Sequence, residues 1–298
     1  MGSSMASDTA QRNDLPSAEL EEAARRAALL IEHADALIIG AGAGMGVDSG
    51  LPDFRGSEGF WRAYPALGRA RIDFESIASP DAFRASASLA WGFYGHRLAL
   101  YRRTVPHEGF ALLRRIGESM RGGSFVYTSN VDGQFQKAGF DPCAIVECHG
   151  SLHHLQCLEP CGDDVWCADA FAPDVDEQAC VLRNAPPACV RCGTLARPNV
   201  LMFGDASWIG VRQHAQQLQL DAWLAAARRP VVVELGAGTA IPSVRHFSQR
   251  VVRAYDAAMI RINPREARVH GPRDVSLPIG AAAGMRAIAE ALNLAKPR

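Results

Sequence analysis

Short apolar runs that alternate with amphipathic segments constrain this chain more than any other feature. The runs are rich in Val, Ile and Leu, and turns separate them from the helical segments. Such runs are typical of strands that are buried on both faces of a parallel sheet. Their alternation with helices predicts an α/β fold built on a doubly wound parallel sheet. The expected strands are 36–40, 124–128, 144–148, 199–203, 231–235 and 258–262, and the expected helices are 17–34, 107–120, 212–229, 243–255 and 281–295.

Two stretches interrupt this alternation. Residues 61–105 are rich in aromatic residues and arginine and contain no convincing strand, and residues 150–197 are rich in Cys, Pro and Asp. We expect them to form a smaller module from a helical insertion and a zinc-ribbon insertion. The other expected parts are a Rossmann-like domain at 17–60, 106–149 and 198–298, and a disordered tail at 1–16 that begins with a cloning scar.

The balance of charge argues against several classes of partner. A net charge of −1 gives no overall field that would recruit nucleic acid or an anionic membrane surface. No apolar run reaches the roughly 18 to 20 residues of a membrane span, and residues 1–16 lack the apolar core of a signal peptide. We therefore expect a cytoplasmic protein that binds neither nucleic acid nor membrane.

The cysteines point to a metal site. Cytoplasmic thiols stay reduced, so eight cysteines need a reason other than disulfides. Cys157 and Cys161 enclose three residues and Cys189 and Cys192 enclose two, so the two pairs could close a tetrahedral zinc site. Cys167 lies nearby and could replace Cys161. Four sulfur ligands leave no open coordination position, which favours a structural zinc over a hydrolytic one.

A glycine-rich turn follows the first expected strand. Gly40, Gly42, Gly44 and Gly46 let the backbone turn sharply and approach a diphosphate closely. A helix N-terminus after them would offer free N–H groups to the phosphates. The same glycines are compatible with a flexible turn, but their place directly after a strand favours a nucleotide site.

The turn ends in a proline, an acid, an aromatic residue and an arginine, residues 52–55. Asp53 and Arg55 could fix ribose hydroxyls or phosphate, and Phe54 could cover a flat ring and exclude water. The alternative interpretation is a structural turn with an Asp–Arg pair and a buried Phe.

The segment GAGMGVDSGLPDFRG, residues 42–56, resembles the dinucleotide-binding loop of sirtuins, the NAD-consuming protein deacylases. The family's serine in this loop is Gly46 here, and that departure loosens the expected contacts with NAD. The resemblance implies that the NAD-binding residues in this segment are Gly42, Ala43, Gly44, Asp53, Phe54 and Arg55.

Residues 127–139, YTSNVDGQFQKAG, resemble the sirtuin segment Thr-Gln-Asn-x-Asp, with Ser129 in place of the glutamine. In the family, the glutamine and asparagine lie beside the nicotinamide ribose and the aspartate helps to recognise nicotinamide. The resemblance therefore implies that Ser129, Asn130 and Asp132 contact NAD and that Asn130 serves catalysis. Because Ser129 is shorter than glutamine, either a water fills the gap or the ribose contact differs. Without the neighbouring motifs, Asn130 and Asp132 would indicate only a turn.

The segment ECHGSLHHLQC, residues 147–157, holds three histidines and two cysteines. It could form a metal site, a catalytic base beside a metal site, or a polar loop. An imidazole with a pKa near 6.5 exchanges a proton at neutral pH, and the carboxyl edge of a sheet is a suitable place for such a group. The His-Gly pair resembles the sirtuin general-base motif, which implies that His149 is the base. His153 and His154 match no role in the family.

The paired cysteines and the segment after them extend the resemblance. The pairing is similar to that of the sirtuin zinc ribbon, although the first pair usually encloses two residues and CLEPC encloses three. Residues 197–205 resemble the strand end and loop that pair with the extended substrate and line the acyl-lysine tunnel. The resemblance implies that Leu201, Phe203 and Gly204 contact the substrate; the alternative is an ordinary buried strand.

A second glycine loop, residues 231–242, matches a sirtuin loop on the dinucleotide. Gly236 is kept, but Ala237 and Gly238 replace the family's Thr-Ser. The missing hydroxyls mean missing hydrogen bonds, unless backbone amides replace them. Asn263 matches the family's asparagine that contacts the adenosine ribose.

These motifs occur in the family's order from about residue 27 to the C-terminus. They imply that acyl groups are removed from a protein or peptide lysine while NAD is consumed. In the family scheme nicotinamide leaves first, the base then takes a proton from a ribose hydroxyl, and the products are free lysine and O-acyl-ADP-ribose. There are two alternatives. One is ADP-ribosyl transfer or NAD hydrolysis, which the departures at Gly46, Ser129 and Ala237 would favour. The other is a non-catalytic NAD-sensing or zinc-binding module. The sequence names neither the acyl group, nor the protein substrate, nor the oligomeric state.

Overall fold

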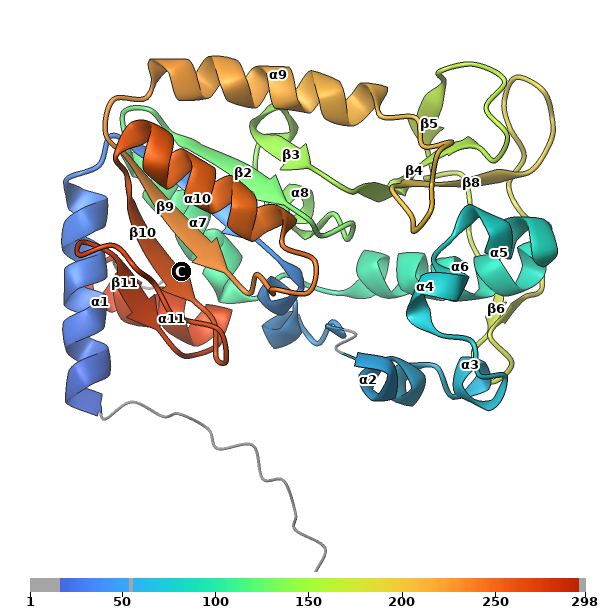
Figure 1. The fold of residues 1–298 in the computed structure, drawn as a ribbon, viewed down its shortest axis with the longest axis horizontal. Helices are drawn as coiled ribbons and strands as arrows, with labels where there is room; N and C mark the ends of the chain where they lie inside the picture. The colour runs from blue at the N-terminus through green and yellow to red at the C-terminus, as the bar shows by residue number, and fades with distance from the viewer. Residues whose placement is uncertain (1–16, 54–55, 295–298) are drawn as a thin grey trace, which may run out of the picture.

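The structure, a computed structural model, describes residues 17–53 and 56–294, without the side chains of residues 56–58. Phe54 and Arg55, two of the predicted NAD-binding residues, lie outside the described residues, as does the expected tail at 1–16. The described part is elongated, with a large parallel sheet at one end and a smaller module at the other (Figure 1).

Six parallel strands form the large sheet, which confirms the predicted fold class (Figure 1). In their order across the sheet they are β11 (Val275–Leu277), β10 (Ala258–Ile262), β9 (Pro230–Leu235), β1 (Ala36–Ala41), β2 (Ser124–Thr128) and β3 (Ile145–Glu147). The chain first builds β1, β2 and β3 outward, and later returns to the other side of β1. The strand order therefore reverses between β1 and β9, and ligands of doubly wound sheets bind at the carboxyl ends of the strands beside such a switch point.

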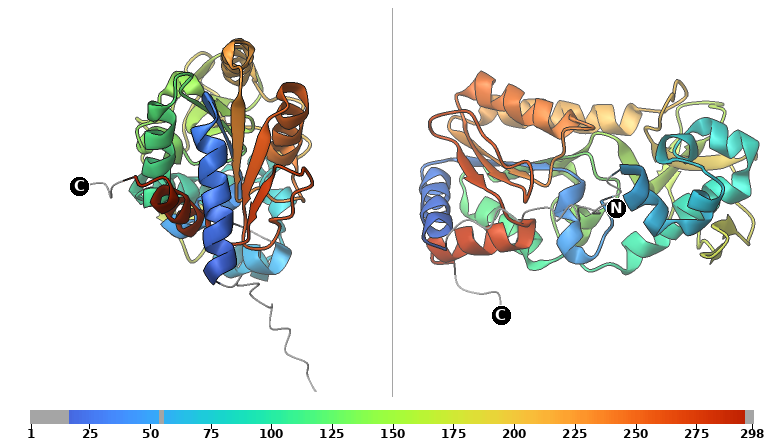
Figure 2. Two further views of the ribbon diagram at one scale, coloured as in Figure 1. Left: turned by 90° about the vertical axis from the view of Figure 1, so that its left-hand side faces the viewer. Right: turned by 60° about the horizontal axis from the view of Figure 1, so that its bottom comes forward.

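Helices cover both faces of this sheet (Figures 1 and 2). One face carries α1 (Ser17–Glu32), α7 (Glu108–Ser119) and α11 (Ala281–Ala291), and the other carries α9 (Val211–Ala226) and α10 (Ser243–Tyr255). These five helices match the predicted ones, although several end a few residues earlier. Leu37 and Ile39 of β1 share a core with the first group, while Ile38 shares a core with the second. Burial on both faces explains why the strands are mostly apolar; among the exceptions, Glu234 of β9 and Arg261 of β10 form a buried ion pair.

The smaller module combines helices with an antiparallel sheet (Figure 1). Its helices are α2 (Gly56–Ala63), α3 (Pro65–Arg69), α4 (Phe74–Ile77), α5 (Pro80–Ala85) and α6 (Ala87–Arg103), and the short α8 (Gln134–Lys137) follows β2. Its strands are β4 (Gly150–Cys157), β5 (Val165–Cys167) and β8 (Ala196–Val200), with a separate hairpin of β6 (Val175–Asp176) and β7 (Val181–Leu182). Leu51, Val131 and Val200 also pack into the core of this module. Because these three residues lie outside the ranges 61–105 and 150–197, the predicted division of the chain into two domains stays a proposal.

The strand predicted over residues 199–203 lies three residues earlier, at β8. Beyond β8, the Leu201 N–H donates to the His149 carbonyl at 2.9 Å, which prolongs the ladder by one contact. The next two amides turn away, since Met202 donates to the Asp205 carboxylate and Phe203 donates to the Ala78 carbonyl. The prediction of a strand at 201–203 is wrong because the local Asp205 carboxylate and the distant Ala78 carbonyl take these amides and outweigh the preference for an extended strand.

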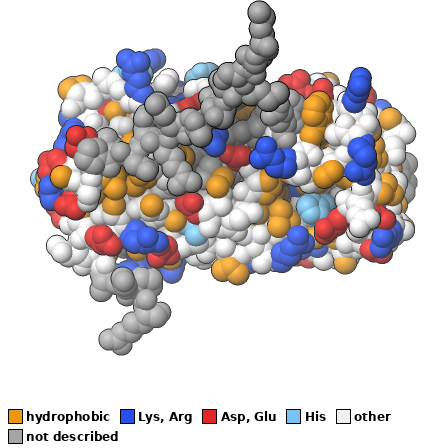
Figure 3. All heavy atoms as spheres, turned by 90° about the horizontal axis from the view of Figure 1, so that it is seen from below, with side chains coloured by type: hydrophobic (Ala, Val, Ile, Leu, Met, Phe, Trp, Pro, Cys, Tyr) orange, Lys and Arg blue, Asp and Glu red, His pale blue; other side chains and the backbone are white. Residues whose placement is uncertain are grey.

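Among the described residues, no helix is both long and apolar enough to cross a membrane. On the face seen in Figure 3, Lys and Arg side chains are mixed with Asp and Glu side chains and do not gather by sign. This mixture agrees with the net charge of −1.

Candidate functional site

Two glycine loops meet at the switch point, directly after β1 and β9. The Gly44 N–H donates to the Gly236 carbonyl at 3.0 Å. A Cβ added at Gly42 would lie 2.7 Å from the Ala237 Cα, and one added at Gly44 would lie 2.7 Å from the Gly236 Cα. Such short separations require glycine, so the two backbones are packed against each other. The structure thus brings together Gly42, Ala43, Gly44, Gly236 and Ala237 at one edge of the sheet.

The first loop continues into two short 3₁₀ turns, Ala43–Met45 and Val47–Ser49, and not into a long helix. A Cβ added at Gly46 would lie 3.0 Å from the Leu51 Cδ1. A side chain at this position would therefore require the end of the Leu51 side chain to shift by a few tenths of an ångström. Asp53 is half-buried in the segment that follows.

Asn130 ties the loop after β2 to the first glycine loop. Its side-chain amide donates to the Gly42 carbonyl at 3.0 Å, and its backbone N–H donates to the Thr128 hydroxyl at 3.0 Å. The Ala41 carbonyl accepts from both the Thr128 hydroxyl and the Ser129 N–H. Ser129, Asn130 and Gly42 are therefore held in one hydrogen-bonded frame at the ends of β1 and β2.

Asp132 is 8% exposed, and burial raises the pKa of its carboxyl group to about 6. The carboxylate accepts from the Gln134 N–H at 2.9 Å. The backbone carbonyl of Asp132 lies 3.0 Å from the His153 Nε2 and accepts a hydrogen bond from it. His153 therefore has a structural partner in the loop that carries Asp132.

His149 lies just beyond the end of β3 and contacts the start of α10. Its Nε2 is 3.0 Å from the Ser243 hydroxyl oxygen. Burial lowers the pKa of the imidazole below its ordinary value of 6.5, and a hydrogen bond with the Ser129 carbonyl opposes part of that shift. The ring is therefore neutral at neutral pH, which is the state that a general base requires.

The other two histidines of the segment have different surroundings. His153 and His154 lie where the register of β4 against β8 shifts, between Ser151 and Leu155. Burial lowers the pKa of His154 to about 4, and the Arg212 charge acts in the same direction. Neither ring belongs to the candidate metal cluster of the described residues, which consists of cysteines alone.

Asn263 and Arg245 hold the second glycine loop. The Asn263 Nδ2 and the Arg245 Nε and Nη2 all donate to the Ala237 carbonyl, at distances of 2.9 to 3.2 Å. Arg245 also donates to the Glu266 carbonyl at 2.7 Å. Sequence reasoning assigned Asn263 but missed Arg245, because an arginine in an amphipathic helix gives no signal that its guanidinium is buried.

Leu201, Phe203 and Gly204 lie on the loop that follows β8. Leu201 is 40% exposed, and its N–H donates to the His149 carbonyl. The Phe203 ring packs edge-on against Phe74 of α4, with 5.7 Å between ring centroids. Gly204 has a φ of 63°, in the left-handed region that favours glycine. An exposed apolar side chain thus lies next to the segment that carries His149.

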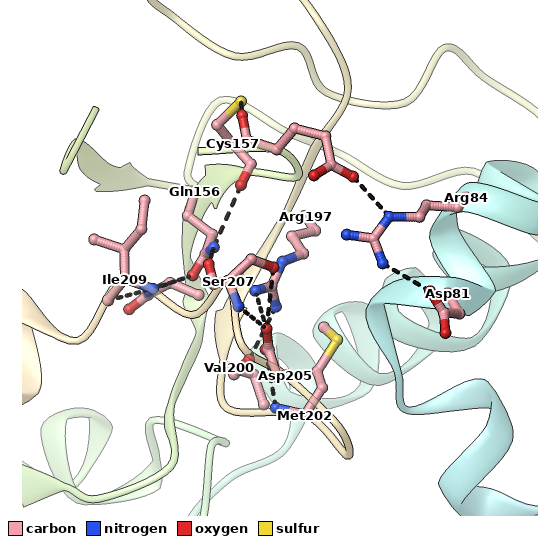
Figure 4. Close-up of polar contacts among 12 residues, drawn as sticks. Asp81, Arg84, Gln156, Cys157, Arg197, Val200, Met202, Asp205, Ser207 and Ile209 are labelled. Atoms are coloured by element: carbon pink, nitrogen blue, oxygen red, sulfur yellow. Dashed lines mark hydrogen bonds and ion pairs between the residues drawn. The ribbon is translucent and has the colours of Figure 1, made fainter. Parts of the chain in front are cut away.

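A buried polar network fixes this loop (Figure 4). The Arg197 Nη2 and the Asp205 Oδ1 form an ion pair at 2.8 Å, and neither side chain has exposed surface. The Asp205 carboxylate also accepts from the Met202 and Ser207 N–H groups and from the Ser207 hydroxyl. The Gln156 side chain joins through the Ser207 carbonyl at 2.8 Å. Sequence reasoning missed this network, because nothing local shows that the charged residues are buried.

Cys157, Cys161, Cys189 and Cys192 place four sulfur atoms within 4.8 Å of one another. The sulfur–sulfur distance is 3.7 Å for Cys157 and Cys192 and 3.6 Å for Cys161 and Cys189. Zinc–sulfur bonds of about 2.3 Å in a tetrahedron require sulfur–sulfur distances of about 3.8 Å. The four-cysteine cluster therefore fits a zinc ion. Cys167, the alternative ligand, lies on β5 and is not part of the cluster.

Thr194 accompanies the second cysteine pair. Its hydroxyl oxygen lies 3.1 Å from the Cys192 Sγ and 3.6 Å from the Cys157 Sγ. The Cys189 N–H donates to the Thr194 carbonyl at 2.6 Å, and Gly193 between them has a φ of 73°. The pair thus sits in a tight turn, and a hydroxyl group is placed to donate to thiolates.

Comparison with known proteins relates this geometry to a family. The profile of the Sir2 family matches residues 42–225. A protein of Aquifex aeolicus named NAD-dependent protein deacylase is 28% identical over 252 residues, which cover 85% of this chain and 93% of the relative. A protein of the same name from Thermus thermophilus is 30% identical over 269 residues, which cover 89% of this chain and 92% of the relative.

Solved structures share the fold. A Sir2 homologue in complex with NAD has a TM-score of 0.66 at 22% identity and covers 95% of this chain and 96% of its own. A Sir2 homologue in complex with ADP-ribose has a TM-score of 0.65 at 23% identity and covers 95% of this chain and 100% of its own. Because the family profile spans more than half of the sequence and the relatives match it over most of its length, this chain belongs to the Sir2 family.

Proposed function

We propose that this protein removes acyl groups from protein lysines in an NAD-dependent reaction that yields nicotinamide and O-acyl-ADP-ribose. The observation that carries the proposal is that the loops after β1, β2 and β9 contact one another, and that the segment after β3 contacts the loop after β8. Gly44 contacts Gly236, Asn130 binds the Gly42 carbonyl, and the His149 carbonyl binds Leu201. The names of the Aquifex and Thermus relatives support the same activity.

The glycine loops and the polar residues after β2 and β10 are the proposed NAD site. NAD supplies a glycosidic bond to nicotinamide, and its cleavage provides the ADP-ribosyl group that accepts the acyl chain. The protein's part is to orient the reacting groups and to exclude water. The proposed NAD-binding residues are Gly42, Ala43, Gly44, Asp53, Phe54, Arg55, Ser129, Asn130, Asp132, Gly236, Ala237 and Asn263.

Within this site we assign His149 the role of general base. A neutral imidazole can take a proton from a ribose hydroxyl, and burial keeps the ring neutral because it lowers the imidazole pKa. Asn130 would orient the ribose from the frame it forms with Gly42. Asp132 would hydrogen-bond the nicotinamide amide.

The loop after β8 is the proposed site of the acyl-lysine peptide. β8 itself is buried, so an extended peptide would pair with the exposed backbone that follows it, from Leu201 onward. Leu201 and Phe203 would line the acyl group, and Gly204 would let the loop turn beside it. Zinc at the four cysteines would hold the far end of β4 and β8 and would take no part in the chemistry.

The test is mass spectrometry of the purified protein with NAD and lysine peptides that carry acetyl, long fatty acyl or succinyl groups. Deacylated peptide and O-acyl-ADP-ribose should appear in equal amounts. The His149→Ala variant should lose about 10²- to 10⁴-fold in rate, while His214→Ala, an exposed histidine of α9, should not change it. If His149→Ala keeps full activity, the base assignment is wrong.

ADP-ribosyl transfer or NAD hydrolysis is the second candidate, because Gly46, Ser129 and Ala237 lack side chains that sirtuins carry. Release of nicotinamide without deacylated peptide would favour this candidate. A Ser129→Gln variant should then bind NAD more tightly and shift the products towards deacylation. Bound NAD with no product from any peptide would instead favour an NAD-sensing module.

A further inference from the structure

His107, to which the proposed reaction gives no role, connects the first glycine loop to the start of α7. It is the residue before this helix, and its Nδ1 accepts a hydrogen bond from the Gly109 N–H at 3.0 Å. Its Nε2 lies 2.9 Å from the carbonyl oxygen of Met45, the last residue of the 3₁₀ turn that contains Ala43 and Gly44. One side chain thus caps a helix and binds the loop that carries proposed NAD-binding residues.

The partners of the two ring nitrogens determine where the ring hydrogen lies. The Gly109 N–H can only donate, so Nδ1 carries a lone pair, and the Met45 carbonyl can only accept, so Nε2 carries the hydrogen. A neutral imidazole has one hydrogen and one lone pair on its two nitrogens, and both are used here. The ring of His107 therefore makes both hydrogen bonds at once in its neutral form.

The residues around this ring leave room for it and pack against it. A Cβ added at Gly109 would lie 2.6 Å from the His107 Cε1, so glycine at this position allows the imidazole to lie over the helix start. The ring also packs against Phe110, with 4.9 Å between ring centroids. Ser, Thr, Asp and Asn are the preferred residues before a helix and would bind the backbone N–H with a shorter side chain. Histidine adds a second nitrogen, which reaches the Met45 carbonyl.

The contact at Met45 attaches the 3₁₀ turn to α7. On its other side the turn is attached to the second glycine loop, because the Gly44 N–H donates to the Gly236 carbonyl at 3.0 Å. His107 binds the Met45 carbonyl with its ring, and its backbone N–H donates to the Ser49 hydroxyl at 2.9 Å. Without the imidazole, the turn would keep its contact with Gly236 and lose the contact with the His107 side chain.

We propose that His107 is a positioning residue of the NAD site, which fixes the first glycine loop through the hydrogen bond from its Nε2 to the Met45 carbonyl. The inference rests on the proposed function, which assigns that loop to NAD. The hydrogen bond from the Gly109 N–H stabilises the start of α7, whereas the hydrogen bond to Met45 holds the loop. Because the two bonds belong to different atoms of one side chain, substitutions can separate them.

Two variants each remove one of these hydrogen bonds. In His107→Asn the side-chain oxygen can accept from the Gly109 N–H, but the side chain is too short to reach Met45. In His107→Gln the amide nitrogen takes the place of Nε2 and can donate to the Met45 carbonyl, while the acceptor at the position of Nδ1 is lost. The same two substitutions at His214, an exposed histidine of α9, are the matched controls.

The two variants should show opposite patterns of NAD affinity and stability. Calorimetry should find NAD binding about tenfold weaker in His107→Asn, the effect of one hydrogen bond, and within about twofold of the wild type in His107→Gln. Urea denaturation should find the midpoint lowered by about 0.3 M in His107→Gln, from the loss of the helix cap, and changed by less than about 0.1 M in His107→Asn. The His214 variants should change neither quantity.

NAD affinity that falls in parallel with the urea midpoint would show a structural role alone and overturn the proposal, as would unchanged affinity in His107→Asn. Hydrogen exchange of the Gly44 and Met45 amides, measured without NAD, gives a readout that does not depend on the ligand. Exchange should be faster in His107→Asn than in the wild type and unchanged in His107→Gln; equal exchange in all three proteins would refute the proposal. If the wild type does not bind NAD, the assignment of the loop to NAD fails, and the exchange rates still decide whether His107 fixes the loop.

Discussion

Replacing Asp205 with alanine would leave a buried positive charge without its partner. The Arg197–Asp205 pair is 2.8 Å long, and neither side chain is exposed. Loss of one member of such a pair costs about 3 to 5 kcal/mol, because the remaining charge stays buried. The Met202 and Ser207 groups that donate to the carboxylate would lose their acceptor as well. We therefore expect a loss of about 4 kcal/mol.

Urea denaturation measures this loss as a shift of the unfolding midpoint. With a slope of about 3 kcal/mol per molar for a chain of this size, a loss of about 4 kcal/mol lowers the midpoint by about 1.3 M. Asp81→Ala is the matched control, because Asp81 pairs with Arg84 at 2.7 Å and both side chains are exposed (Figure 4 shows the pair). That variant should shift the midpoint little, since exposed pairs are screened by water.

The Asp205→Ala variant should also affect the proposed substrate loop. Asp205 binds the Met202 N–H between Leu201 and Phe203, so its loss should raise the KM for acyl peptide more than it lowers kcat. The double variant Arg197→Met with Asp205→Ala should recover part of the stability, because it removes the stranded charge. A midpoint shift below about 0.3 M, or equal shifts in Asp205→Ala and Asp81→Ala, would refute the reasoning.

Three further perturbations test other parts of the site. Gly44→Ala should weaken NAD binding at least about tenfold, as measured by calorimetry, because the added Cβ would lie 2.7 Å from the Gly236 Cα. Gly59→Ala is the control, since Gly59 has open space around it and the change should leave NAD binding unaffected. Removal of zinc by a chelator should lower the thermal midpoint, and added zinc should restore it, because the free energy of metal binding at the four cysteines adds to the free energy of folding. Lowering the pH from 6.5 towards 4 should reduce the free energy of unfolding, because the His154 pKa is about 4 when folded and near 6.5 when unfolded, so the unfolded chain takes up the proton first. His154→Gln should weaken that pH dependence, as measured by urea titrations.

The parallel sheet was predictable from the sequence because burial on both faces leaves an apolar run. The predicted strand 258–262 coincides with β10, for example, and the predicted helix 243–255 coincides with α10. β4 escaped prediction because it carries buried polar residues such as Gln156, whose partners lie far away in sequence. β11 has three residues and is too short to show a pattern.

The sequence could predict residues of the candidate site only where the local backbone geometry requires a particular residue type. The glycines after β1 and β9 are needed because two backbones approach closely, and a glycine in a turn can be recognised in the sequence. Arg245 and Ser243 instead act through partners that only the fold brings near: the Ala237 carbonyl and the His149 ring. A distant pair such as His149 and Ser243, 94 residues apart, leaves no trace in local composition.

One structural element also separates the proposed base, His149, from the metal cluster. In the β4–β8 ladder, Gly150 pairs with Val200 at one end and Cys157 pairs with Ala196 at the other. The residue before this ladder is His149, and the residue after it on β8 is Leu201, so the ladder joins the metal cluster to both sides of the site. Zinc bound at the cysteines would therefore fix the strand register that sets His149 opposite Leu201, although it contacts neither residue. The eleven residues 147–157 thus contain the proposed base His149 near one end and the metal-cluster residue Cys157 at the other, with seven residues of the connecting strand between them.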